Sequence, residues 1–200
     1  MLVHVTQNQR IELLNQIRSI AAPGDILRFY HRTSWRSRLI KLITRCEKPH
    51  LCIYAGKDEI IGMLKGRVRR HRVGRFLRPE YDLEIVRGDP EILRSVRKFL
   101  NQKESKRDLG IIWGMLICNY IFRGDVRNIF PYQMAGVTCS GIVSAAIHKV
   151  YTIKSCHPPL MDTPKDAEVL IRKIGLPTLI KLELVRETLR PNVQLTGARR

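Results

Sequence analysis

The chain has 200 residues, enough for one domain with a sizeable core, and its hydrophobic content of 44% is typical of a globular protein. Its net charge of +18 is unusual and predicts an anionic partner, namely cell wall, nucleic acid or anionic lipid. The chain does not open with a basic segment followed by an apolar one, and its longest apolar run, residues 109–122, is too short to span a bilayer. We therefore expect no signal peptide and no transmembrane helix, in a protein that is cytoplasmic or carried in a virion.

Apolar spacing and turn residues predict the elements in chain order. The expected helices are residues 8–20, 35–44 after a Ser34 cap, 90–101 after an Asp89 cap, 109–122, 139–150 and 164–174. The expected strands are residues 26–30, 48–57, 59–64, 81–87 and 178–185, with a basic, partly alternating stretch at 67–73. Hairpins rather than regular βαβ units connect the strands, so we expect a mixed α+β domain. The expected organisation is a helical extension at 1–21, one domain at 22–187 and a basic polar tail at 188–200.

The chain contains five cysteines, which are Cys46, Cys52, Cys118, Cys139 and Cys156. The number is odd, and no pair or Cys/His cluster has the spacing of zinc ligands. The simplest interpretation is free thiols in a reducing compartment, without a metal or other cofactor.

Cys139 opens an apolar run of small residues that is predicted to be a buried helix. In the first turn of a helix, unpaired backbone N–H groups and the helix dipole favour the thiolate, which is the nucleophilic form of cysteine. The alternative is a small buried core residue, since free cysteine is often buried.

A nucleophilic cysteine needs a base, and His50 is the leading candidate because it opens a predicted core strand directly after Pro49. A histidine on a strand facing a cysteine on a helix is the arrangement of papain-like enzymes. The alternative is a histidine at a strand edge that makes one structural hydrogen bond.

Four segments, in this order, bear on the family of the chain: Pro23-Gly24-Asp25-Ile26-Leu27, Pro49-His50-Leu51-Cys52-Ile53-Tyr54-Ala55-Gly56, Thr138-Cys139-Ser140-Gly141-Ile142-Val143 and Thr163-Pro164-Lys165-Asp166. With them the chain resembles the permuted branch of the NlpC-type papain-like superfamily, which includes lecithin retinol acyltransferase-like and YiiX-like proteins. The resemblance spans roughly residues 22–170, and histidine precedes cysteine, the reverse of ordinary papain.

This resemblance implies a circularly permuted papain-like fold of the α+β class, with a small antiparallel sheet packed against helices. It also implies attack by cysteine on an amide, ester or thioester. Carried over by position, Cys139 is the nucleophile, His50 is the base, and the backbone N–H of Cys139 is one oxyanion donor.

Relatives place a polar third residue about a dozen positions after the catalytic histidine, which falls close to Gly62 here. His71 and Glu59 are nearby candidates to orient His50, with His71 slightly favoured because Glu59 needs a bulge to reach the right face. A backbone carbonyl or a water molecule remains an alternative.

The basic stretch contains Arg67, Arg69, Arg70 and Arg72. It is either an anion-binding rim or a solvated strand edge whose charges discourage aggregation. Aromatic residues do not alternate with these arginines, which disfavours a protein that stacks single-stranded bases.

The leading hypothesis is a thiol-dependent hydrolase, an amidase or peptidase whose expected substrate is a cell-wall peptide. The second is a non-catalytic structural or binding protein that uses its basic surface to hold nucleic acid, membrane or a partner protein. The third is a lipid acyltransferase or esterase.

Overall fold

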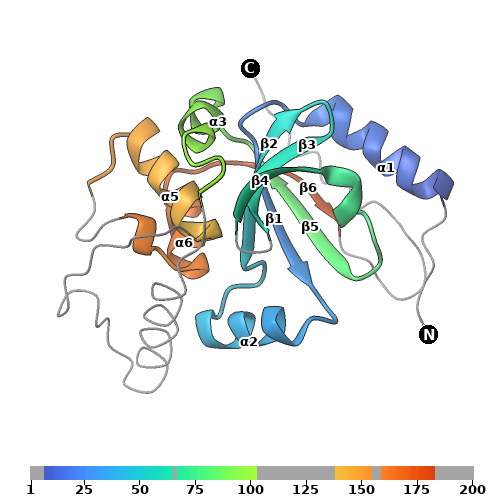
Figure 1. Cartoon of the computed structure of the whole chain (residues 1–200), viewed down its shortest axis with the longest axis horizontal. Coiled ribbons are helices and arrows are strands. Elements are labelled where there is room, and N and C mark those ends of the chain that lie inside the picture. The colour runs from blue at the N-terminus through green and yellow to red at the C-terminus, as the bar shows by residue number, and fades with distance from the viewer. Residues whose placement is uncertain (1–6, 65–66, 103–137, 155–158, 183–200) are drawn as a thin grey trace.

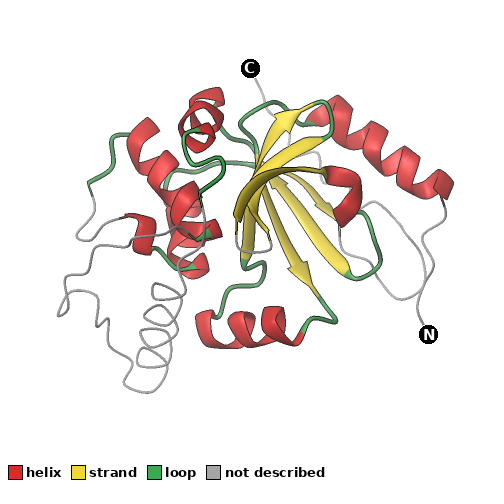
Figure 2. Ribbon diagram, in the orientation of Figure 1, coloured by secondary structure: helices red, strands yellow, loops and turns green. Residues whose placement is uncertain are grey.

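The structure is a computed structural model, and it describes residues 7–64, 67–102, 138–154 and 159–182. These residues form a mixed α+β arrangement with one open, six-stranded antiparallel sheet and five α-helices (Figures 1 and 2). The predicted apolar helix at 109–122 and the polar tail lie outside the described residues.

The sheet has the strand order β4-β3-β2-β1-β5-β6, so β1 and β2 lie at its centre and β4 at one edge. Its strands are β1 (Ile26–His31), β2 (His50–Gly56), β3 (Glu59–Leu64), β4 (Arg67–Arg72), β5 (Tyr81–Val86) and β6 (Thr178–Leu182). The predicted hairpin of β2 and β3 is confirmed. Lys57 and Asp58 form its turn with φ values of 51° and 62°, the left-handed conformation that matches the twist of two antiparallel strands.

Helices cover both faces of the sheet and one of its ends (Figure 1). They are α1 (Gln7–Ile20), α2 (Trp35–Thr44), α3 (Pro90–Arg97), α5 (Cys139–Val150) and α6 (Pro164–Lys173), with two short 3₁₀ helices, η1 (Val73–Phe76) and η3 (Pro159–Met161). Side-chain caps at Ser34, Asp89, Thr138 and Thr163 each accept a backbone N–H of the following turn. The predicted helix starts are therefore confirmed. The caps stabilise these starts because they satisfy backbone N–H groups that a helix leaves unpaired. None of the helices in the described ranges has the length and apolar character needed to cross a membrane.

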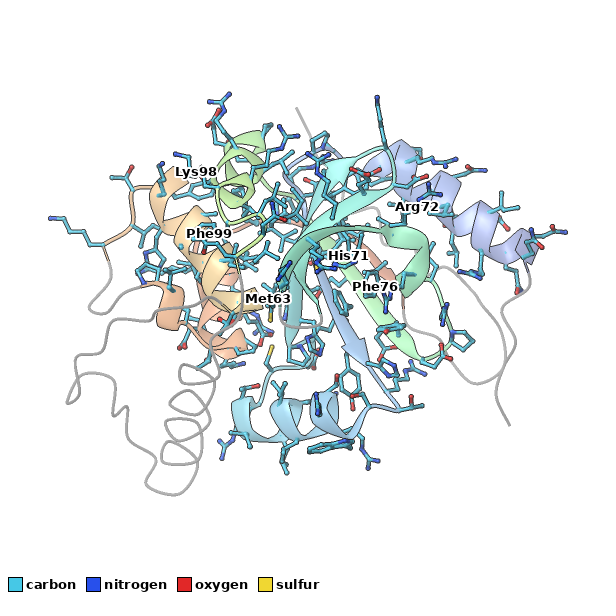
Figure 3. The ribbon with its side chains drawn as sticks, in the orientation of Figure 1. Met63, His71, Arg72, Phe76, Lys98 and Phe99 are labelled. Carbon is cyan, nitrogen blue, oxygen red and sulfur yellow. The ribbon has the colours of Figure 1, made fainter. Side chains whose placement is uncertain are left out.

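Alternating residues of the strands supply two separate cores. Leu51 and Ile53 of β2 face α3, α5 and α6, whereas Cys52 and Tyr54 face the side covered by α1 and η1. Figure 3 shows the same division, with Met63 on the α5 side and His71 beside Phe76 on the other. The two cores decide on which side of the sheet each candidate residue lies.

A buried ion-pair network joins the centre of the sheet to α6. The Arg28 side chain is only 7% exposed, and its guanidinium lies 3.1 Å from Glu84 and 3.3 Å from Glu168. Burial acts to raise the pKa of Glu168, but Arg28, Lys165 and Arg172 outweigh it and lower that pKa overall. Because charges in a protein interior are costly without partners, the network holds α6 in one position on the sheet.

We expect Arg28→Met to lower the free energy of unfolding by about 3 kcal/mol, because it leaves buried carboxylates without their central cation. Arg94→Met is the matched control: Arg94 pairs with Glu91 on the exposed surface of α3, and its loss should change stability by less than about 0.5 kcal/mol. Urea titration of both variants measures the difference. Equal effects would show that the network does not hold α6.

Candidate active site

Cys139 is the first residue of α5, as predicted. The cap residue Thr138 accepts the backbone N–H of Gly141 at 3.0 Å, which sets the first turn of the helix. The thiol therefore lies where unpaired N–H groups and the helix dipole favour a negative charge. Cys139 is partly exposed.

The start of α5 is held tightly against the turn at 159–162. Ser140 Oγ donates to the carbonyl of Asp162 at 2.7 Å. A Cβ atom at Gly141 would lie 2.2 Å from the carbonyl oxygen of Leu160, a distance that no real side chain could adopt. Glycine at 141 therefore permits the close approach that fixes the position of the neighbouring thiol.

The thiol of Cys139 also lies beside the beginning of β2. Its Sγ is 3.9 Å from the carbonyl oxygen of Pro49, the residue immediately before His50. Cys139 and Pro49, which are 90 positions apart in the sequence, are thus brought together where α5 meets the beginning of β2.

His50 is held by neighbours on two elements, α2 and β1. Its Nε2 lies 2.9 Å from Ser37 Oγ of α2, and its ring stacks on Phe29 of β1 with a centroid distance of 5.3 Å. Burial, together with repulsion from His31, lowers the pKa of His50 to about 4. The imidazole is therefore neutral at pH 7 and is a weaker base than an ordinary histidine.

Ser37 is the functional candidate that our sequence analysis missed. Its side chain is buried on the inner side of α2, and it contacts His50, which lies 13 residues later in the chain. When Nε2 carries the imidazole hydrogen, Ser37 accepts it and the free lone pair lies on Nδ1. The available signal in the sequence was a small polar residue on the inner side of a capped amphipathic helix, which is too common to single out.

Gly62, close to the position where relatives carry a polar third residue, has no room for a side chain. A Cβ there would lie 2.2 Å from the Sγ of Cys52, which stands directly opposite on β2 and is fully buried. The space that a third catalytic group would need is filled by the Cys52 thiol.

The register separates His71 from His50. Tyr54, Ile60 and His71 lie in one row across β2, β3 and β4, and His50 precedes Tyr54 by four residues. The two histidine backbones are therefore roughly 13 Å apart along the strands and roughly 10 Å apart across them. We therefore do not assign His71 the orienting role. Burial, Arg75 and Arg69 lower its pKa, and among the described residues its buried Nε2 has no hydrogen-bond partner.

Glu59, the other candidate for that role, points to a different part of the surface. It lies at the far end of β3, opposite Arg72, and its carboxylate pairs with Arg70 at 3.3 Å. Neither of the two candidates from the sequence is placed beside the imidazole.

The four arginines of the proposed anion-binding rim all lie on β4, the edge strand. Arg69, Arg70 and Arg72 are exposed, and Arg67 is half-buried. Strand alternation sends Arg67 and Arg69 to one face and Arg70 and Arg72 to the other. The rim is therefore a charged strand edge, and the four side chains do not converge on a single pocket.

The remaining cysteines and His148 lie elsewhere. Cys46 is buried, with its Sγ 3.6 Å from the carbonyl of Pro164, and burial raises its pKa to about 11. His148 Nδ1 lies 2.9 Å from the carbonyl oxygen of Ile153. Cys118 and Cys156 are outside the described residues. Within the described ranges, no three His, Cys, Asp or Glu side chains gather closely enough to hold a metal ion.

Comparison with known proteins leaves the family of the chain open. No protein-family model matches the sequence, and a comparison with curated proteins finds no match either.

We expect Gly62→Ala to destabilise the protein by about 2 kcal/mol, because the new methyl group collides with the Cys52 thiol in a packed core. Cys52→Ala in the same chain should restore part of the loss. Gly74→Ala is the matched control, since its Cβ would meet only Leu14 at an ordinary 3.7 Å. Chemical denaturation of the wild type, Gly62→Ala, Cys52→Ala, the double variant and Gly74→Ala measures the coupling, and additive effects would contradict the packing described.

The lowered pKa of His50 predicts a dependence of stability on pH. In the unfolded chain this histidine takes up a proton near pH 6.5, but in the folded protein it does so only near pH 4. The contribution of His50 to the free energy of unfolding is therefore fully present above pH 6.5 and is lost as the pH falls to 4. In that range the free energy of unfolding changes by at most about 1.4 kcal/mol per pH unit. In His50→Gln that part of the slope should vanish. If the free energies of unfolding of His50→Gln and wild type differ by the same amount at every pH, the pKa of His50 is not lowered in the folded protein.

Proposed function

We propose that this protein is a thiol-dependent hydrolase in which Cys139 is the nucleophile and His50 is the base. The observation that carries the proposal is the placement of the Cys139 thiol, in the first turn of α5, 3.9 Å from the carbonyl oxygen that immediately precedes His50. Ser37 is the group that orients the imidazole, through the 2.9 Å contact with Nε2.

The proposed reaction has two halves. The lone pair of His50 accepts the thiol proton, and the resulting thiolate forms a bond with the substrate carbonyl carbon. The backbone N–H of Cys139 stabilises the oxyanion, and His50 returns the proton to the leaving amine or alcohol as that bond breaks. Water, deprotonated by the same imidazole, then releases the acyl group as a carboxylic acid and restores the thiol.

The arrangement of the elements supports a permuted papain-like fold. A strand after Pro-Gly-Asp comes first, the strand opened by His50 follows beside it, and the helix opened by Cys139 comes later in the chain. This order matches the family that the sequence resembles. Cell-wall peptides are the proposed substrates, since anionic cell wall suits a net charge of +18.

A non-catalytic binding protein on the same fold is the second candidate, and one observation favours it. Gly62 cannot carry a side chain, so the usual third residue of the family is missing and its space is occupied by Cys52. In that case the basic surface, rather than the thiol, would carry the function. A lipid acyltransferase or esterase remains the alternative within the thiol-dependent class.

The test is the pH dependence of iodoacetamide labelling at Cys139, followed by mass spectrometry so that each cysteine is read separately. We expect a labelling midpoint well below the value of about 8.5 for an ordinary thiol. His50→Ala should return the midpoint to that value, and Ser37→Ala should slow labelling less than His50→Ala does. The buried thiols of Cys46 and Cys52 serve as internal controls and should label slowly throughout.

An ordinary midpoint that His50→Ala leaves unchanged would overturn the hydrolase proposal and favour the binding protein. If the thiol is activated, hydrolysis of cell-wall peptides and of acyl lipids by wild type and Cys139→Ser distinguishes the two thiol-dependent candidates.

A further inference from the structure

The outer side of α2 carries an apolar stripe that the fold does not use. Trp35, Leu39 and Leu42 recur at helical spacing, and Trp35 and Leu42 are 67% and 61% exposed. The opposite side of the same helix meets the rest of the protein through the buried Ser37 and Thr44. Packing of the core therefore does not explain why the outer stripe is apolar.

The stripe forms one wall of an open groove with a volume of about 740 Å³. Tyr30, at the end of β1, supplies a further aromatic surface to it. The groove is open rather than enclosed, so it suits an extended apolar surface better than a buried small molecule.

Cations surround this apolar groove. Arg38, Lys41 and Arg45 line it, and Arg36 lies over the Trp35 ring at 5.6 Å. Residues 35–45 contain four Lys and Arg and no Asp or Glu. Within the part of the chain that the structure describes, none of these four cations takes part in a salt bridge, so their charge is available to an anionic partner.

We propose that the outer face of α2 docks on the surface of an anionic lipid bilayer. Trp35, Leu39 and Leu42 enter the boundary between headgroups and acyl chains, and the flanking arginines and Lys41 contact the phosphates. Tryptophan and long basic side chains are the residues that membrane interfaces favour.

Charge and apolar area together select this partner. A second copy of the chain would bring two sets of four cations face to face, which is unfavourable. A nucleic acid would pair with the cations but would leave the leucines in water, because its backbone is polar. A bilayer satisfies both kinds of side chain. The inference does not depend on catalysis by Cys139, so its test stands apart from the labelling experiment.

The test is co-sedimentation of the full chain with vesicles of phosphatidylcholine alone or with about one-third phosphatidylserine, at about 0.1 M salt. We expect binding only to the anionic vesicles. Trp35→Ala/Leu42→Ala should weaken it at least about tenfold by removing the inserted side chains. Arg38→Glu/Arg45→Glu should weaken it at least about a hundredfold by changing four units of charge.

Two matched controls separate the α2 face from general charge and hydrophobicity. Arg94→Glu/Arg97→Glu makes the same charge change on α3, which lies at the opposite end of the molecule in Figure 1. Val169→Ala removes a comparably exposed apolar side chain, 52% exposed, from α6. Both should leave vesicle binding within about threefold of wild type.

Equal weakening by the α3 and α2 charge variants would overturn the proposal, as would binding that survives Trp35→Ala/Leu42→Ala. Failure of the wild type to bind anionic vesicles would overturn it too. Loss of duplex DNA binding in the α2 variants, with vesicle binding unchanged, would assign the face to nucleic acid instead. Because the mutated side chains are exposed, unchanged thermal unfolding of each variant confirms that it is folded.

Discussion

The close approach of α5 to the turn at Leu160 is the contact on which the candidate site depends. Gly141 permits this approach, because any Cβ there would overlap the Leu160 carbonyl. Ser140 adds a hydrogen bond to the same turn, and Thr138 caps the helix from the other side. These contacts fix the first turn of α5 against the turn at 159–162, and they give the Cys139 thiol a defined position within a favourable electrostatic field.

The imidazole is positioned by a different set of contacts, which come from β1 and α2. Phe29 supports the ring, Ser37 holds Nε2, and burial keeps the ring neutral at pH 7. The site therefore combines α5, β2 and α2, elements that are separated in the chain and are joined only through the sheet. The inner side of α2 contacts His50 through Ser37, and its outer side carries the apolar stripe with its flanking cations.

Charge has two different roles in the molecule. Arg28 is buried between Glu84 and Glu168, and there it holds α6 to the sheet. The arginines of β4 and α2 lie at the surface, where they repel one another and attract anions. On β4 the charge follows an edge strand. On α2 it surrounds an apolar groove, and this combination distinguishes the α2 face from the rest of the basic surface.

The sequence alone determined the local structure. Ser34 and Asp89 marked two helix starts, the hairpin of β2 and β3 was evident, and Cys139 was placed in a first helical turn, because capping and alternation act between residues close in the chain. Only the tertiary structure decided what surrounds His50. Sequence spacing favoured His71, yet the strand register carries His71 away, and Ser37 occupies the place beside the imidazole. Register and helix docking depend on contacts between distant segments, and no pattern within one segment contains them.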